Sequence, residues 1–433
     1  MKNLTKFQVI LLGVFGSFII IGVIVFAIGR TTKTGSAVEL LIWGTMPRLD
    51  FSEVMKVSGL DKNEDFKLTY EEKRLDSFDI DFLEALASGI GPDLFFIPAE
   101  SILKYESRAL TIPFRSISER NFKDSFIEGG EVFLTEGGIL ALPIYVDPLV
   151  MYWNRDHFNN AGIVNPPKFW DEIYDLSSVL TLRDSSLNIR RSGVALGEYI
   201  NISNSFEVLS ALIMQAGNSI TSRGQQGTVV STLGDNLNFS IPPTESALSF
   251  YTEFSNPLKQ FYSWNRSLPL SKNYFISGDL SIYFGLASEL FDIRDKNPNL
   301  NFDIASLPQV RGTDKNVTYG KIEGIAVNRQ SRKWESALMM ARVLSGQELS
   351  STFSQIKSLP PARRDLLSRK PERAFMEIFY REAVIAKTWL IPDRVRANEI
   401  FKDMVESVTG GRSRPREAVI RAVTELGLLL RRN

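Results

Sequence analysis

Short apolar runs alternate with segments of helical periodicity in the part of the chain after position 37. Strand-length runs lie at 38–43, 66–70 and 93–97, and Gly44 and Pro98 end the first and the last of them. Apolar side chains at helical spacing lie between the second and third runs, at Phe78, Phe82, Leu83, Leu86 and Ile90. This order predicts a parallel sheet with helices on its faces, and ligands of such sheets bind beyond the carboxyl ends of the strands.

The rest of the chain continues the alternation. We expect helices at about 204–216, 334–344 and 418–430, a strand at 301–306, and a polar, glycine-rich surface loop at 218–238. The apolar run at 139–152 is broken by Pro143, Asp147 and Pro148, which predicts a crossing between lobes rather than one uninterrupted strand. Because 433 residues exceed one core of ordinary size, we expect two lobes.

The amino-terminal run is long enough to cross a membrane. An uncharged stretch at 7–29 follows Lys2 and Lys6 and reaches the roughly 20 residues that a helix needs to span a bilayer. It is too long for the apolar region of a signal peptide, and the small-residue segment 35–37 lies several residues beyond it. We therefore expect an uncleaved single-pass anchor at 1–30, a linker at 31–37 and an extracellular carboxy-terminal body. A cleaved signal is the alternative.

Composition restricts the chemistry of this body. Fifty basic residues balance 50 acidic residues, so the net charge of zero gives no electrostatic reason to expect nucleic acid as a partner. The lack of cysteine excludes disulfides, thiolate metal sites, cysteine nucleophiles and a lipid anchor on cysteine. His157 is the single histidine, which excludes a histidine metal cluster and a Ser-His-Asp triad elsewhere. We expect no cofactor and no metal.

The most informative motifs lie between positions 137 and 181. After a glycine pair they are Leu142-Pro143, Trp153-Asn154-Arg155-Asp156, Ala161-Gly162 and Pro166-Pro167-Lys168-Phe169-Trp170-Asp171-Glu172. This order resembles the extracellular solute-binding proteins of ABC importers, in the family that binds sugars and oligosaccharides and includes maltose-binding protein. Further similar segments extend the resemblance from position 38 to the carboxyl terminus, at Gly91-Pro92-Asp93, Leu307-Pro308 and Leu359-Pro360-Pro361.

The resemblance implies an α/β fold of the two-lobed periplasmic-binding-protein-like type II, a clam-shell with a hinge between two α/β lobes. The implied division is 38–145 and 307–359 for lobe 1, and 146–306 and 360–433 for lobe 2. It also implies a monomer without enzymatic activity that binds a small-molecule solute, a sugar or oligosaccharide, and delivers it to ABC transporter permease subunits.

The resemblance further implies where the solute is bound. The positions that match the family's binding segments are Thr45, Met46, Arg48, Glu100, Tyr145, Asp147, Asp393 and Asn398. Maltose-type relatives carry tryptophans where this chain has Ile97, Ala287 and Asn398, so the stacking surface differs from theirs.

Three of the candidates also follow from the residues themselves. Asp147 is the strongest polar candidate, because a carboxylate among prolines and apolar neighbours needs a partner; a hinge salt bridge or helix cap is the alternative. Trp264, in a loop at the expected cleft mouth, and Trp389, at a lobe crossing, could stack on a sugar ring. A surface role is the alternative for Trp264.

Two other classes of function stay open at this stage. A signalling or adhesion receptor could use the same two lobes, and the non-cleavable anchor favours it. A glycoside hydrolase would need paired carboxylates, and no motif in the sequence joins two acidic residues in this way.

Overall fold

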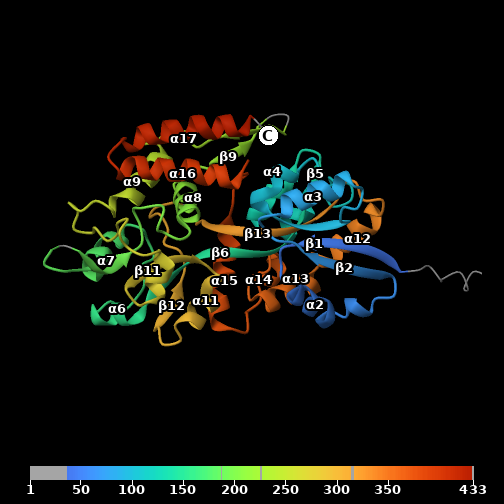
Figure 1. Cartoon of the computed structure of the whole chain (residues 1–433), viewed down its shortest axis with the longest axis horizontal. Helices are drawn as coiled ribbons and strands as arrows, with labels where there is room; N and C mark the ends of the chain where they lie inside the picture. Colours follow the sequence, from blue (N-terminus) through green and yellow to red (C-terminus); the bar gives the residue numbers. More distant parts are fainter. Residues whose placement is uncertain (1–36, 187, 225–226, 314–315, 432–433) are drawn as a thin grey trace, which may run out of the picture.

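The computed structural model describes residues 37–431 apart from 187, 225–226 and 314–315. The expected anchor at 1–30 lies outside the described residues, as does the linker except for Ala37. Among the described residues, none of the helices has the length and apolar character needed to cross a membrane. Two lobes lie side by side along the longest axis of the molecule (Figure 1).

One sheet of ten strands runs through both lobes. The order along its main path is β2-β1-β3-β13-β6-β11-β8-β7, with β12 also paired to β6 and β14 to β13. The strands are β1 (Val38–Gly44), β2 (Phe66–Glu72), β3 (Leu94–Pro98), β6 (Leu142–Asn154), β7 (Leu182–Arg183), β8 (Ile189–Val194), β11 (Leu280–Leu286), β12 (Phe302–Ala305), β13 (Thr318–Val327) and β14 (Ala386–Lys387). As predicted, β1, β2 and β3 are parallel, whereas β6 and β13 are antiparallel to each other.

Each lobe carries its own set of helices around its part of the sheet. Lobe 1 carries α2 (Arg48–Val57), α3 (Phe78–Ala87), α4 (Ile102–Tyr105), α5 (Glu119–Ser125), α12 (Trp334–Leu344), α13 (Gln347–Lys357) and α14 (Arg364–Leu367). Lobe 2 carries α6 (Arg155–Asn160), α7 (Glu172–Leu180), α8 (Ser205–Gln215), α9 (Pro243–Glu253), α10 (Ser271–Ile276), α11 (Glu289–Lys296), α16 (Arg394–Thr409) and α17 (Pro415–Leu430). α15 (Ala374–Ile385) lies between them, and 3-10 turns occur at η1 (Leu60–Lys62), η2 (Ala99–Ser101) and η3 (Glu128–Phe133).

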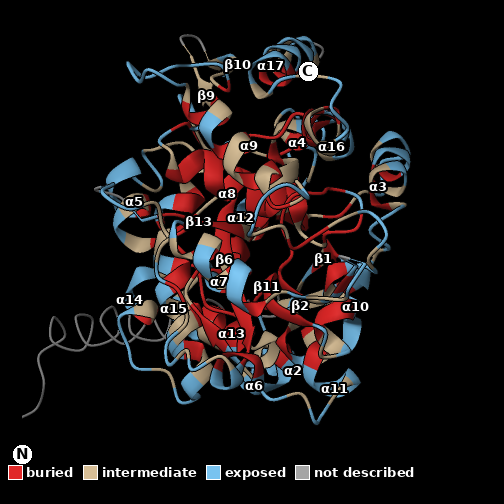
Figure 2. Cartoon of the chain, turned by 90° about the vertical axis from the view of Figure 1, so that its left-hand side faces the viewer, coloured by how far each residue is buried: buried red, intermediate tan, exposed pale blue. Residues whose placement is uncertain are grey.

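Each lobe has its own hydrophobic core. Buried residues from 40–146 and 322–353 form the core of lobe 1, and those from 149–319 and 391–426 form the core of lobe 2. Between 359 and 390 the chain contributes to both, with Phe379 and Trp389 in lobe 2 and Ala383 and Ala386 in lobe 1. Figure 2 shows the buried positions on the central strands and on α8, all of whose residues are buried.

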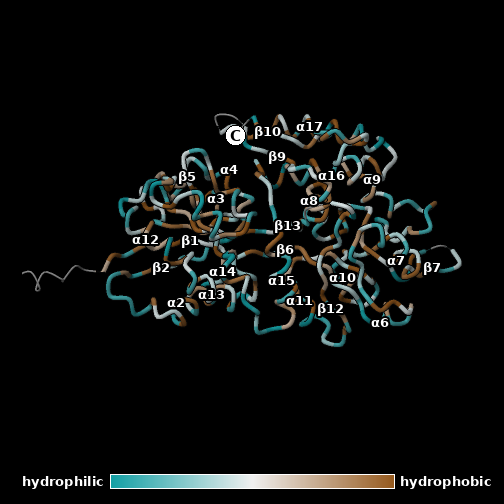
Figure 3. The backbone as a smooth tube through the Cα atoms, turned by 180° about the vertical axis from the view of Figure 1, so that it is seen from behind, coloured by the Kyte–Doolittle hydropathy of each residue, from teal (hydrophilic) through white to brown (hydrophobic). Residues whose placement is uncertain are grey.

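The strands β6 and β13 carry the chain between the lobes (Figure 3). The expectation that prolines break the 139–152 run is wrong, because β6 is one strand of 13 residues. Pro143 pairs with Gly324, where the register of the ladder shifts, and Pro148 pairs with Gly320. The carbonyl of Pro148 still accepts a hydrogen bond, from Ala287 at 2.9 Å. A proline removes only its own N–H, so a strand can continue through it where that donor is not needed.

A hairpin of lobe 2 also reaches lobe 1. The stretch predicted as a surface loop contains β9 (Thr221–Arg223) and β10 (Val229–Ser231), while β4 (Leu134–Thr135) and β5 (Gly138–Ile139) form a second small hairpin. Arg223 of β9 makes two hydrogen bonds of 3.2 Å to the carboxylate of Glu106, and Val229 packs against the lobe 1 core. The loop prediction is therefore wrong at these positions, because contacts with the other lobe hold the strands.

Candidate functional site

The floor of the site is a polar strip on the two strands that join the lobes. In the antiparallel pair, Lys321 of β13 lies opposite Asp147 of β6, and Glu323 lies opposite Tyr145. Side chains alternate between faces along a strand, so these four share one face. All four are partly exposed, whereas Val146 and Ile322 on the other face are buried. We call these four residues the cleft floor.

Side chains from both lobes meet next to the cleft floor. Glu207, in the first turn of α8, lies 2.9 Å from Arg394 at the start of α16 and 3.2 Å from Lys321. Glu100 of lobe 1 lies 3.6 Å from Arg394 and accepts a hydrogen bond from the hydroxyl of Tyr319. We call Glu100, Glu207, Tyr319, Lys321 and Arg394 the interlobe cluster.

Ion pairing keeps Glu207 and Lys321 charged despite their burial. Burial alone would raise the pKa of Glu207, but Lys321 and Arg394 outweigh it and lower that pKa. Burial likewise opposes protonation of Lys321, yet Glu207 and Glu100 raise its pKa above the usual value. The guanidinium carbon of Arg394 also lies 3.7 Å from the ring centroid of Phe206, which adds a cation–π contact.

The two carboxyl groups of the cleft floor, in contrast, have raised pKa values. Burial raises the pKa of Asp147 to about 6, although the hydrogen bonds to Ser288 and the charge of Lys321 act against the shift. Burial raises the pKa of Glu323 to about 8, opposed by Lys357 and reinforced by Glu100. Among the described residues, no hydrogen-bond partner or ion pair is found for Glu323, nor for the hydroxyl of Tyr145. Such groups are ready to bind a polar ligand.

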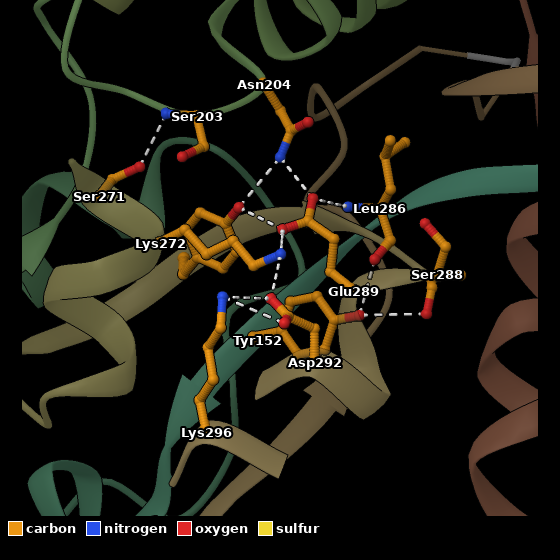
Figure 4. Close-up of polar contacts among 12 residues, drawn as sticks. Tyr152, Ser203, Asn204, Ser271, Lys272, Leu286, Ser288, Glu289, Asp292 and Lys296 are labelled. Atoms are coloured by element: carbon orange, nitrogen blue, oxygen red, sulfur yellow. Dashed lines mark hydrogen bonds and ion pairs between the residues drawn. The ribbon is translucent and has the colours of Figure 1, made fainter. Parts of the chain in front are cut away.

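A second polar network fixes the lobe 2 wall beside Asp147. Glu289, in the first turn of α11, accepts hydrogen bonds from Asn204 and Tyr283, both at 2.7 Å, and from the N–H of Leu286 at 3.0 Å (Figure 4). The adjoining N–H of Ser288 donates to Asp147 at 2.9 Å. The turn that follows β11 is thus held in place by its own side chains and in turn orients the carboxyl group of Asp147.

The structure brings three of the predicted site residues directly to this place. Glu100 belongs to the interlobe cluster, and Tyr145 and Asp147 belong to the cleft floor. Asn398 lies at its edge, since its side-chain oxygen accepts from Tyr199 at 2.8 Å and from Arg394 at 3.4 Å.

The other predicted residues have structural contacts. Asp393 caps the amino terminus of α16 by accepting from the N–H of Arg396. Thr45 and Arg48 are exposed after β1, and Met46 is buried with its carbonyl bound to the Tyr70 hydroxyl at 2.7 Å.

Both tryptophans lie in the core of lobe 2. Trp264 is 0% exposed and donates its indole N–H to Asn201 at 3.1 Å, which corrects the expected position at the cleft mouth. Trp389 is 2% exposed, stacks on Phe206 and donates to Ser210 at 3.2 Å. A buried indole needs one polar partner and otherwise packs like a hydrophobe, and each of these rings has one such partner.

Sequence reasoning did not single out Glu207, Lys321, Glu323 and Arg394. A signal for two of them was present, because Lys321 and Glu323 alternate with Ile322 and Gly324 in an otherwise apolar strand. Charged side chains at every second position of a buried strand indicate a functional face. Glu207 and Arg394 carry no comparable local signal.

A separate cavity of about 1140 Å³ also lies between the lobes. Its walls come from η3 of lobe 1, from the 214–223, 239–246 and 310–313 segments of lobe 2, and from the 387–390 segment, which contributes to both cores. Of the predicted site residues, only Trp389 lines it. In the described part of the chain, acidic and histidine side chains form no group of three that could hold a metal ion.

Comparisons with known proteins identify the family and the fold of the chain. The model of the bacterial extracellular solute-binding protein family matches residues 76–338, more than half of the chain. A binding protein of Brucella abortus (strain 2308) is 23% identical over 314 residues, covering 71% of this chain and 70% of that protein.

Solved structures show the same fold. A cyclo/maltodextrin-binding protein complexed with maltotetraose is similar with a TM-score of 0.74 at 16% identity, covering 91% of this chain and 98% of its own. The sugar-binding protein MalE of Xanthomonas citri is similar with a TM-score of 0.72 at 15% identity and the same coverage. The fold is therefore the two-lobed α/β periplasmic-binding-protein-like fold, as expected.

Proposed function

This chain belongs to the bacterial extracellular solute-binding protein family, and from that premise we propose that it binds a carbohydrate between its lobes for an ABC importer. The observation that carries the proposal is the partly exposed polar strip of Tyr145, Asp147, Lys321 and Glu323 at the lobe junction. A sugar offers a rim of hydroxyl groups and an apolar ring face, and the strip offers hydrogen-bonding groups beside an aromatic ring. One structural relative is a complex with maltotetraose and the other is described as a sugar-binding protein, which supports the same class of solute.

The proposed mechanism involves binding and conformational change without covalent chemistry. Glu100 of lobe 1 and Arg394 and Glu207 of lobe 2 meet next to the cleft floor, so a solute held there would contact both lobes at once. Such a solute binds the closed arrangement better than an open one and shifts the population toward it. We further propose that the closed form is presented to permease subunits, with the 1–30 segment as membrane anchor.

A thermal-shift screen of the purified chain against mono- and oligosaccharides, polyols, amino acids and oligopeptides tests the proposal. A solute at a hundred times its Kd stabilises the folded state by about 2.7 kcal/mol, which moves the melting midpoint by a few degrees. We expect carbohydrate hits that weaken in Tyr145→Phe, whose hydroxyl has no partner within the described protein. A well-folded protein that responds to no carbohydrate would contradict the proposal.

A further inference from the structure

The cleft floor and the interlobe cluster together contain four acidic side chains, Glu100, Asp147, Glu207 and Glu323, and two basic side chains, Lys321 and Arg394. Lys321 and Arg394 both pair with Glu207, and Arg394 also lies 3.6 Å from Glu100. Within the described residues, Asp147 and Glu323 make no salt bridge to any lysine or arginine. Two carboxyl groups of the cleft floor thus have no ion-pair partner among the described lysines and arginines.

The nearby basic residues are engaged elsewhere. Lys321 lies opposite Asp147 in register, but its ammonium group is 3.2 Å from Glu207. Lys357 of α13 influences Glu323, but its ammonium group lies 3.0 Å from Asp50 of α2. The remaining groups that face Glu323 add no positive charge, because they are Glu100 of η2, Tyr145 of β6 and Tyr70 of β2.

These two carboxyl groups, of which Asp147 also accepts a hydrogen bond from Ser288, lie within reach of one small ligand group. Asp147 and Glu323 are diagonal neighbours on the same face of adjacent antiparallel strands, which places their Cβ atoms about 7 Å apart. A group of the size of an ammonium ion between them can donate to both. The ring of Tyr145, directly opposite Glu323, adds an aromatic neighbour of the kind that attracts organic cations.

Burial disfavours the ionised form of both carboxyl groups. Burial raises their pKa values to about 6 and about 8, so Glu323 is largely protonated at neutral pH when nothing is bound. A cation beside Glu323 would favour its ionised form and would displace that proton. A metal ion is a poor match, because no third acidic or histidine ligand in the described residues completes a group.

We propose that the solute carries a protonated amine, which binds between Glu323 and Asp147 beside the ring of Tyr145. The inference rests on the proposed function, and the solute is then an amino sugar or an oligosaccharide that contains one. Its hydroxyl groups form hydrogen bonds with the interlobe cluster, which includes Lys321. Its amine supplies a positive charge beside Glu323 and Asp147.

Calorimetric titration of the full-length chain at pH 7 tests this with matched trimers. The probes are the glucosamine trimer, its fully N-acetylated counterpart, neutral maltotriose and, as an amine without a sugar, spermidine. We expect the free amine to bind at least tenfold more tightly than the acetylated trimer. Repeating the titration in two buffers of different ionisation enthalpy is expected to show net proton release that is lost in Glu323→Gln.

Two further variants separate the role of charge from folding. Asp147→Asn is expected to weaken the amine at least fivefold and the neutral trimers less than twofold. Glu335→Gln removes an exposed charge of α12 and is expected to change neither. Melting curves check each variant, and Glu323→Gln is expected to fold because it replaces a buried carboxyl group that is largely neutral already.

The outcomes distinguish this inference from the function on which it rests. Tight binding of the neutral or acetylated trimer, without preference for the amine and without a Glu323-dependent proton, overturns the inference and leaves carbohydrate binding intact. Binding of spermidine that depends on Glu323, with no response to any sugar, upholds the cation site and overturns the carbohydrate proposal. No binding of any probe overturns both.

Discussion

Removing the side chain of Arg223 is expected to loosen the contact between the lobes. Both guanidinium NH2 groups of Arg223 lie 3.2 Å from an oxygen of Glu106, across the lobe boundary. The side chains are 17% and 36% exposed, so the pair is partly screened by solvent. A bidentate but partly exposed pair of this kind contributes about 1 kcal/mol, since exposed pairs give less and charge-assisted bidentate pairs give more.

The energy of the Arg223–Glu106 pair determines how far its loss shifts the balance between closed and open molecules. If the pair forms only when the lobes are closed, losing about 1 kcal/mol lowers the ratio of closed to open molecules about fivefold. The Kd of a solute that needs the closed form then rises by up to the same factor. Small-angle X-ray scattering of unliganded Arg223→Ala should show a larger radius of gyration than the parent.

A double-mutant cycle with Glu106→Gln isolates the pair from other effects of each change. We expect a coupling energy near 1 kcal/mol in the binding free energy. Arg190→Ala serves as the control, because Arg190 pairs with Asp184 at 2.8 Å within lobe 2. A coupling below about 0.3 kcal/mol together with unchanged scattering would refute the argument that this contact favours closure.

Three further expectations follow from the site. Arg394→Ala should lower the free energy of unfolding by about 2–4 kcal/mol in urea titrations, because Glu207, 4% exposed, loses one of its two cations; a loss below 0.5 kcal/mol would contradict this. Burial raises the pKa of Glu382 to about 7, so its favourable contribution to stability is complete below about pH 4.5 and is lost as the pH rises through about 7. The stability of Glu382→Gln relative to the parent should therefore increase between pH 5 and 8, and a constant difference would count against it. Trp264→Phe should lower the melting temperature without changing solute affinity, whereas Tyr145→Phe should lower solute affinity without changing the melting temperature. A loss of affinity in Trp264→Phe would place Trp264 in the site.

The fold was largely accessible from sequence because its main elements have strong local patterns. The run predicted at 38–43 is β1, the run at 93–97 is β3 shifted by one residue, and the helix expected at 204–216 is α8. The hairpin β9–β10 was missed for the opposite reason. Its local sequence is polar, and its stabilising contacts are Val229 on the lobe 1 core and Arg223 on Glu106, 117 positions away.

Only part of the candidate site could be predicted from the sequence. Tyr145 and Asp147 could be found because they belong to a single recognisable segment, and Glu100 because it follows a strand. The pair of Glu207 and Arg394 depends on residues 187 positions apart, which periodicity does not connect. Trp264 was misplaced because its neighbours are polar, while its indole reaches Asn201, 63 positions earlier, inside the lobe 2 core.

The irregularity in the β6–β13 ladder bears on how the lobes can move. The register shifts between Glu323 and Gly324, on the ribbon that joins the two lobes. A bulge bends and twists the strands at one point, so it offers the ribbon a natural pivot. Glu323 lies at that pivot, so a rotation of one lobe relative to the other would change the direction of its carboxyl group. The residues proposed to contact the solute and the joint between the lobes are therefore the same few residues, so we expect a substitution that alters selectivity to alter lobe movement as well.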